Sequence, residues 1–236
     1  MEGAEETAKL ARALGAEVHV MRCDVVDPAQ VEALAAEADR RFGGSDLIVN
    51  NAGVAVAGKI GEVSLDDWRW IVDINMWGVV YGCHAFVPRF RKQGSGHIIN
   101  VASAAGLLSA PEMGPYNVTK AAVVALSETL YGELNKLGIG VSVLCPTFFR
   151  TNIAKSGRMS GDGRAQKHAQ HLMDKAKITA EGVARVALEA ADDKQLYVIP
   201  QADGRWLWRL KRAAPATFYA GIGKVIDRAM RMQENS

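Results

Sequence analysis

The stretch HIINVASAAGLLSAPEMGPYNVTK, residues 97–120, decides the fold that the sequence predicts. It opens with HIINVAS, an apolar run that is typical of a strand buried on both faces of a parallel sheet. A helix is expected to follow, and it carries Tyr116 and Lys120 four positions apart. Side chains at this spacing project from one helical face. Ser103 closes the strand, so the fold can bring it beside Tyr116.

These three residues suit acid–base chemistry on an oxygen atom. A free tyrosine has a pKa of about 10 and keeps its proton near neutrality. A lysine ammonium nearby favours the phenolate and lowers that pKa, so the pair can act as general acid or base. The Ser103 hydroxyl can hydrogen-bond a carbonyl or alcohol oxygen of a substrate. From these residues alone, the alternative is a pair of surface side chains on a helix and an ordinary strand-end serine.

Helices and strands alternate on both sides of this stretch. Asp27 and Pro28 are typical of a helix start, and Gly43 suits the end of the same helix. Helices are expected over 3–14, 27–43, 65–92, 114–138 and 179–192, and strands over 16–24, 47–50, 97–103, 140–146 and 194–200. This alternation predicts an α/β fold, a doubly wound parallel sheet in three layers with helices on both faces.

Ligands bind such sheets outside the carboxyl ends of the strands. Polar, small or turn-forming residues follow strand after strand, namely Asp24-Val25, Asn50-Asn51-Ala52-Gly53, Ser103 and Pro146-Thr147. Each group alone is ordinary loop composition. Together they outline a cleft along one edge of the sheet.

Five ordered features resemble the short-chain dehydrogenase/reductase family. They are Asn50-Asn51-Ala52-Gly53 after an apolar strand, Asn75 in the next helix, Ser103, the Tyr116-x-x-x-Lys120 pair and Pro146-Thr147 after a later strand. The resemblance covers nearly the whole chain from residue 3 onward. It implies a single Rossmann-like domain over residues 1–236.

The resemblance also implies roles for individual residues. Tyr116 is similar to the family's catalytic acid/base, and Lys120 to the residue that lowers its pKa and holds the nicotinamide ribose. Ser103 is similar to the residue that orients the substrate oxygen, and Asn75 to the one that anchors a water in the proton relay. An ordinary helix-interior asparagine is the alternative for Asn75. The implied cofactor-binding residues are Asp24, Val25, Asn51, Ala52, Gly53, Tyr116, Lys120, Pro146, Thr147, Phe149 and Thr151.

The sequence departs from the family at two places. Thr147 stands where the family usually has glycine, so that edge of the cleft is expected to be reshaped. The family's Gly-rich phosphate turn, with the strands on either side of it, does not occur in residues 1–30. We therefore expect a natural protein longer by roughly 35 to 45 residues, with Met1 a wrongly assigned start. A genuine truncated product is the alternative, and translation of the upstream DNA distinguishes the two.

Composition excludes several other classes. The net charge of +2 gives no reason to expect nucleic acid as a partner. The cysteines (Cys23, Cys83 and Cys145) are far apart and predicted to be buried thiols, and no metal site is expected from the histidines. No apolar run is long enough to predict a membrane span, and the acidic N-terminus does not resemble a signal peptide. A cytoplasmic location is predicted.

Two further segments bear on the substrate and on partners. Residues 147–177 lie where the family's substrate lid lies, and a mobile surface loop is the alternative. The C-terminal extension, 204–236, combines Trp206 and Trp208 with basic residues. It can pack on its own domain, cover the substrate pocket or contact a membrane surface. The helices 65–92 and 116–137 match those that pair in the family, so a homodimer or homotetramer is expected.

The function predicted is hydride transfer between NAD or NADP and an apolar secondary alcohol or ketone. The acidic stretch EGAEET favours NAD, because a basic residue normally accompanies the NADP phosphate. One alternative is a relative that binds a ligand or partner without redox turnover. Another is a sugar-nucleotide epimerase, which also uses Tyr-x-x-x-Lys but normally needs a larger substrate domain.

Overall fold

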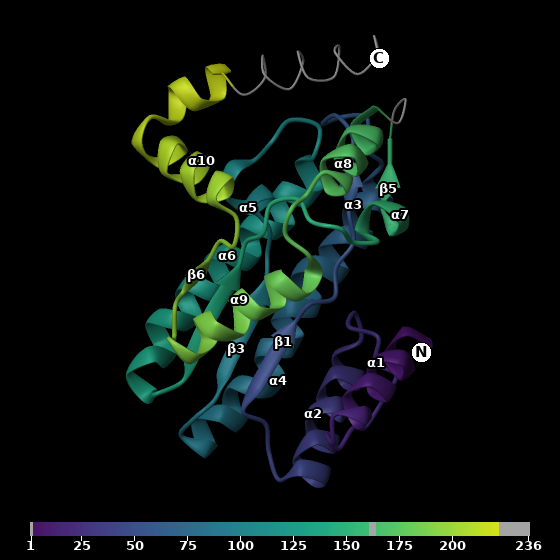
Figure 1. Cartoon of the computed structure of the whole chain (residues 1–236), viewed down its shortest axis with the longest axis vertical. Helices are drawn as coiled ribbons and strands as arrows, with labels where there is room; N and C mark the ends of the chain where they lie inside the picture. The colour runs from purple at the N-terminus through teal and green to yellow at the C-terminus, as the bar shows by residue number, and fades with distance from the viewer. Residues whose placement is uncertain (1, 161–163, 222–236) are drawn as a thin grey trace.

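The computed structural model describes residues 2–160 and 164–221 (Figure 1). Its strands are β1 (Leu47–Asn50), β2 (Val56–Ala57), β3 (His97–Val101), β4 (Gly140–Leu144), β5 (Arg158–Met159) and β6 (Tyr197–Val198). Its α-helices are α1 (Glu2–Ala13), α2 (Pro28–Phe42), α3 (Leu65–Val72), α4 (Gly78–Gln93), α5 (Ala104–Leu108), α6 (Gly114–Leu134), α7 (Ile153–Ser156), α8 (Arg164–Asp174), α9 (Ala180–Asp192) and α10 (Ala202–Ala213). A π-helical turn, η1 (Asp73–Trp77), and a 3-10 turn, η2 (Asn135–Leu137), complete the set.

A parallel sheet in the order β1-β3-β4-β6 forms the centre of the molecule. Successive side chains of its strands face opposite sides, so the two faces have separate cores. Ile98 packs with residues of α4 and α6 on one face, whereas Ile99 packs with Val183 and Ala187 of α9 on the other. Figure 1 shows α9 in front of the strands with α4 and α6 behind them. The predicted three-layer α/β fold is confirmed.

The edge strand β1 differs from its prediction. Of its apolar residues, only Ile48 is buried, while Leu47 and Val49 are 36% and 50% exposed. Residues 16–24, predicted to be a strand, form no ladder within the described part of the chain. A strand needs a neighbour that accepts its hydrogen bonds, and residues 16–24 pair with no other strand in the described part of the chain. The apolar pattern was therefore present without the partner that would make a strand.

Helix prediction fared better, because its signals are local. Asp27 caps α2 by accepting from the Ala29 amide, and Gly43 ends α2 in the left-handed conformation. Ser64 likewise caps α3. The helix expected over 65–92 is interrupted by η1, a π-helical turn that contains Asn75. The short helix α5, directly after β3, was not predicted.

The segments after β4 contain more structure than the sequence indicated. Residues 147–177 include α7, β5 and α8, and β5 pairs in parallel with β2. The extension folds into α10 and a further helical stretch over 215–221, while residues 222–236 lie outside the described residues. Among the residues that the structure describes, no helix combines the length and apolar character needed to cross a bilayer.

Candidate active site

Tyr116 and Lys120 lie in the first turns of α6, at the carboxyl end of β3. Both are buried, and the Lys120 Nζ atom lies 5.8 Å from the centre of the Tyr116 ring. Lys120 Nζ also donates a hydrogen bond to the Val101 carbonyl oxygen at 2.8 Å. The helical spacing of the pair and the end of the strand thus place the ammonium beside the phenol.

Ser103 joins this pair from the other side. It is the N-cap of α5, where its hydroxyl accepts from the Ala105 amide at 3.1 Å. The Ser103 hydroxyl also lies near enough to Tyr116 to lower the pKa of the phenol. The structure therefore brings together the three residues that sequence reasoning assigned to catalysis.

Burial controls the protonation of the site. It raises the pKa of Tyr116, and the nearby Ser103 hydroxyl only partly opposes this. Burial also lowers the pKa of Lys120 to about 8, with the nearby Cys145 acting in the opposite direction. Burial, the largest effect on the pKa of Tyr116 in this structure, acts in the direction opposite to the lowering expected from Lys120. A raised pKa favours the protonated form of the phenol.

Asn75 connects the loop after β1 to α6. Its side chain accepts from the Val54 amide at 2.8 Å and donates to the Val54 carbonyl at 2.9 Å. It also donates to the Thr119 hydroxyl at 3.3 Å. The π-helical turn adds a residue to the helix at this point and turns Asn75 inward, as such turns often do at functional sites. Asn75 is fully buried, and its side chain bonds Val54 and Thr119 rather than the backbone of its own helix.

Sequence reasoning missed a second layer of buried polar residues. Asn50 donates to Asn100 at 2.8 Å, and Asn100 donates to Ser127 of α6 at 3.0 Å. The Thr119 hydroxyl donates to the Tyr116 carbonyl at 3.0 Å. Buried polar groups need partners, and these chains hold β1, β3 and α6 in one register behind the site. The sequence signal that could have predicted this layer was a polar residue, Asn100, within an otherwise apolar strand.

Gly53 leaves space at the centre of the site. A Cβ atom added there would lie 3.4 Å from both Lys120 Nζ and Asn75 Oδ1. The neighbouring Asn51 and Ala52 are exposed, so this loop presents its backbone outward beside the lysine. A glycine between two polar groups is suited to close approach of a ligand.

The residues expected at the adenine end are less enclosed. Asp24 is exposed, and its carboxylate accepts from the Val26 amide at 3.2 Å. The Val25 side chain packs at the start of α4, 3.0 Å from the Cβ position of Gly78. These residues lie on the unpaired segment before α2 rather than at the end of a strand.

The Cys83 thiol takes part in the polar layer behind the site through contacts with Asn50 and Asn100. Cys83 and Cys145 are buried and Cys23 is half-buried, and all are free thiols. Burial raises the pKa of Cys145 to about 12. Within residues 2–160 and 164–221, no cluster of three His, Cys, Asp or Glu side chains could hold a metal ion.

The fold and these residues agree with one family. Residues 1–160 match the family model for short chain dehydrogenases. The chain belongs to the short chain dehydrogenase family. The C alpha-dehydrogenase of Sphingobium sp. (strain NBRC 103272 / SYK-6) is 32% identical over 215 residues, which cover 86% of this chain and 70% of that relative.

Solved structures of the family superpose closely on this short-chain dehydrogenase. A short chain dehydrogenase/reductase from Burkholderia phymatum, in complex with NAD, is 38% identical with a TM-score of 0.83, covering 90% of this chain and 81% of that one. A short-chain dehydrogenase from Streptomyces avermitilis is 26% identical with a TM-score of 0.78, covering 95% and 86%. The chain is thus an oxidoreductase by family.

In this short-chain dehydrogenase the segment after β4 divides between the site and the core. Pro146 is buried and Thr147 half-buried, whereas Phe148 is 39% exposed. The Phe149 side chain packs in the core beneath α9, and Thr151 is exposed. The side chain of Phe149 therefore faces the core, so any contact of this residue with a cofactor would run through its backbone.

Proposed function

We propose that this protein transfers hydride between a nicotinamide cofactor and a secondary alcohol or ketone. The observation that carries the proposal is the grouping of buried Tyr116 and Lys120 with half-buried Ser103 at the carboxyl edge of the sheet. A protonated phenol, a neighbouring ammonium and a hydroxyl form a site that binds and protonates a carbonyl oxygen.

The residues divide the work as follows. Ser103 hydrogen-bonds the substrate oxygen and fixes its position beside the phenol. During ketone reduction, Tyr116 donates its proton to that oxygen; during alcohol oxidation, the phenolate takes the proton back. Lys120 stabilises the phenolate that forms, because its positive charge lies beside the ring. Asn75 holds the adjoining loop through its hydrogen bond with the Val54 amide. We place the end of the proton path beside Gly53, between the Asn75 side chain and the Lys120 ammonium.

A nicotinamide cofactor, when bound, supplies or accepts the hydride. The space beside Gly53, with Lys120 and Asn75 on its border, suits the ribose hydroxyls of the nicotinamide end. We assign the amide of that end to the backbone of residues 146–151, and the adenine end to Asp24 and Val25 with the loop 51–53. NAD is preferred, since the acidic residues Glu5 and Glu6 disfavour an added phosphate. The NAD complex of the Burkholderia relative supports the same choice.

The substrate side of the site is apolar. Tyr116 packs in a cluster with Val56 and Ile71, and partly buried apolar side chains surround it, including those of Met113 and Met159. Met159 belongs to β5, within the segment 147–177 that we propose as the substrate lid. An apolar alcohol or ketone fits these surroundings best.

Arg158 fastens this lid segment to α3. Its Nη1 atom lies 2.9 Å from Asp67 Oδ1, and its guanidinium lies 3.9 Å from the centre of the Trp70 ring. The backbone adds hydrogen bonds from Arg158 to Ala55 and from Ser160 to Ala57. The lid is therefore held in place over the apolar cluster by both side-chain and backbone contacts.

The test is an assay of NADH or NADPH absorbance with a panel of apolar ketones and alcohols. Tyr116→Phe should lower kcat by roughly 10²- to 10⁴-fold, since it removes the proton donor. Tyr131→Phe, further along α6, is the matched control and should leave kcat unchanged. Activity that survives Tyr116→Phe would refute the mechanism. Ligand binding without turnover on any substrate and with either cofactor would favour the binding-protein alternative.

We also propose a homo-oligomer built on α4 and α6. Trp77, just before α4, is 42% exposed and Val118 of α6 is 53% exposed, which leaves apolar side chains at the surface of both helices. Val118→Glu should shift the mass measured by light scattering toward the monomer. A monomeric wild-type protein would overturn this assignment.

Peripheral membrane contact through the extension is a separate proposal. Trp206 is 63% exposed and Leu210 36% exposed on α10, beside the exposed basic residue Arg209. Replacement of both apolar residues by serine should reduce co-sedimentation with anionic vesicles. Equal sedimentation of variant and wild type would leave the extension with the role of packing on its own domain.

A further inference from the structure

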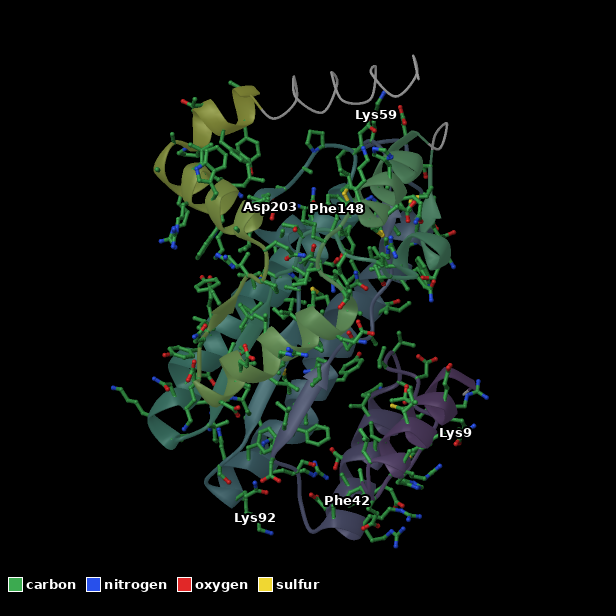
Figure 2. All side chains as sticks on the ribbon, viewed as in Figure 1. Lys9, Phe42, Lys59, Lys92, Phe148 and Asp203 are labelled. Atoms are coloured by element: carbon green, nitrogen blue, oxygen red, sulfur yellow. The ribbon has the colours of Figure 1, made fainter. Side chains whose placement is uncertain are left out.

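The start of α10 is hydrogen-bonded to the turn that follows β4. The Gln201 side chain accepts from the Thr147 amide at 3.0 Å and donates to the Phe148 carbonyl at 3.3 Å. The Thr147 hydroxyl in turn donates to the Asp203 carboxylate at 3.4 Å. Asp203 and Phe148 lie at the same end of the sheet (Figure 2). A single glutamine amide therefore satisfies both the donor and the acceptor of an irregular turn.

Gly204 makes this contact sterically possible. It is buried in α10, and a Cβ atom added there would lie 2.8 Å from the Thr147 methyl carbon and 3.1 Å from that of Ile199. The backbone of Gly204 is not in the left-handed region, so conformational freedom does not explain the residue. Glycine within a helix is less stable than alanine by roughly 1 kcal/mol. The glycine is thus explained by the space that the Thr147 side chain occupies.

α10 is itself firmly attached to the domain. Lys211 donates to the Leu107 carbonyl of α5, the short helix that Ser103 caps. The Trp208 and Tyr197 rings lie 4.8 Å apart, which joins α10 to β6. Arg205 donates to the carbonyls of Ile199 and Pro200 at 2.7 and 2.8 Å. α10 can therefore act as a rigid support that reaches both the Ser103 side and the Thr147 side of the site.

We propose that Gln201 and Gly204 are positioning residues that set the place of the 146–148 turn and, through it, of the nicotinamide end of the cofactor. Thr147 and Gly204 form a matched pair: a side chain is present at 147, where the family usually has glycine, and a side chain is absent at 204. This inference rests on the proposed function, because it assigns the amide of the nicotinamide to the 146–151 backbone.

Four proteins test the pair: wild type, Gly204→Ala, Thr147→Ser and the double variant. Serine keeps the hydroxyl of Thr147 but removes the methyl group that the new Cβ atom would meet. Gly204→Ala should weaken NADH binding, measured by fluorescence titration, roughly tenfold through displacement of the turn. The double variant should recover most of that loss. Thr147→Ser alone provides the baseline with which the double variant is compared.

Gly132→Ala is the matched control for Gly204→Ala. Gly132 also lies within a helix, but a Cβ atom there would meet nothing within 4 Å. It should leave NADH binding unchanged and raise the melting temperature, because alanine favours the helix. If Gly204→Ala behaves like Gly132→Ala, or if Thr147→Ser fails to rescue it, the pairing is wrong.

Gln201→Ala tests the hydrogen bonds. It should speed hydrogen exchange at the Thr147 amide and raise the KM for NADH more than it lowers kcat. Gln195→Ala, beyond the opposite end of β6, removes a glutamine side chain that bonds only Asp193 among the described contacts and should do neither. Unchanged exchange at Thr147 in Gln201→Ala would overturn the role of Gln201.

Hydrogen exchange separates failure of this inference from failure of the proposed function. If the wild-type protein binds no NADH, the proposed function fails, and the exchange rates still judge the positioning. Faster exchange over 146–148 in Gly204→Ala, reversed in the double variant, supports positioning of the turn by α10. Exchange that is the same in all four proteins rules it out.

Discussion

The parts of the molecule on the two sides of β1 differ in how completely their apolar side chains are buried. On the side of β3, β4 and α6, Ile98 and Val141 are fully buried, and Leu134 at the end of α6 is too. On the side of α1, the segment 16–24 and α2, Leu14 is 89% exposed, and Val49 of β1 itself is 50% exposed. Figure 1 shows α1 and α2 beside the sheet at its β1 edge, away from its centre. We call these the α6 region and the α1–α2 region.

The two regions hold different parts of the proposed site. Tyr116, Lys120 and Ser103 lie in the α6 region, where Tyr116 and Lys120 are buried and Ser103 is half-buried. The residues assigned to the adenine end, Asp24 and Val25, lie in the α1–α2 region on an unpaired segment. Catalytic geometry depends on supporting packing. The acid–base groups are therefore more firmly placed than the residues at the adenine end.

The largest expected effect is a loss of stability from a substitution in the core of the α6 region. Leu134→Ala should lower the free energy of unfolding by about 2–5 kcal/mol, because it leaves a cavity in the core of α6. Leu10→Ala, at a 65% exposed position of α1, should change it by no more than about 0.5 kcal/mol. Urea denaturation measures both. Equal losses would show that the two regions do not differ in the stability they contribute.

Lys120→Met should stabilise the α6 region at neutral pH, because Lys120 is a buried cation with a pKa of about 8. The lowering from 10.5 to about 8, at 1.36 kcal/mol for each pKa unit, corresponds to roughly 3 kcal/mol. Below pH 8 both the folded and the unfolded wild type carry the charge, so the variant keeps its full advantage. Between 8 and 10.5 the unfolded chain binds more protons than the folded one, so wild-type stability rises and the advantage shrinks.

Melting temperatures measured from pH 6 to pH 11 check the sign of this effect. Lys177→Met, at an exposed lysine, is the control and should differ from wild type by a constant amount. An advantage of Lys120→Met that grows with pH would contradict the assignment.

Arg89 joins the two regions, and its loss should loosen only one of them. From α4 it reaches Glu32 at 2.7 Å and Asp39 at 2.8 Å, both on α2. Arg89→Met should speed hydrogen exchange in α2 but not in α6, with a loss of stability of about 1 kcal/mol. Arg89 lowers the pKa of Glu32 through its hydrogen bond, so the pair contributes at neutral pH. Its contribution is lost as the pH falls through the lowered pKa of Glu32.

The smallest effect is expected at the lid. Arg158 is 48% exposed, so its pairing with Asp67 should contribute less than about 1 kcal/mol. Arg158→Ala should still speed hydrogen exchange at the Arg158 and Ser160 amides, and high salt should reduce the difference. Arg69→Ala breaks the exposed pair with Asp66 on the same helix and should leave these amides unchanged. Equal exchange rates at the Arg158 and Ser160 amides in the two variants would show that the Arg158 side chain does not hold the lid in place.

The α6 region was the more predictable of the two, for a physical reason. Strands β3 and β4 are apolar on both faces, and α6 carries Tyr116 and Lys120 at helical spacing, so local patterns sufficed. Residues 16–24 alternate apolar and polar side chains as a half-buried strand would, but they form no strand because a strand depends on a neighbour. The π-helical turn at Asn75 and the rise in the Tyr116 pKa were likewise not visible in local patterns. Both depend on what surrounds the residue in space.

The sequence by itself determined the three-layer α/β class, the family and the three residues expected to act on a substrate oxygen. These follow from periodicity, turn chemistry and the order of motifs, which are properties of neighbouring residues. Only the tertiary structure decided that burial raises the pKa of Tyr116 and that β1 leaves Val49 exposed. It also decided that the first turn of α10 supports Thr147, because Gly204 and Thr147 lie far apart along the chain and meet only after folding.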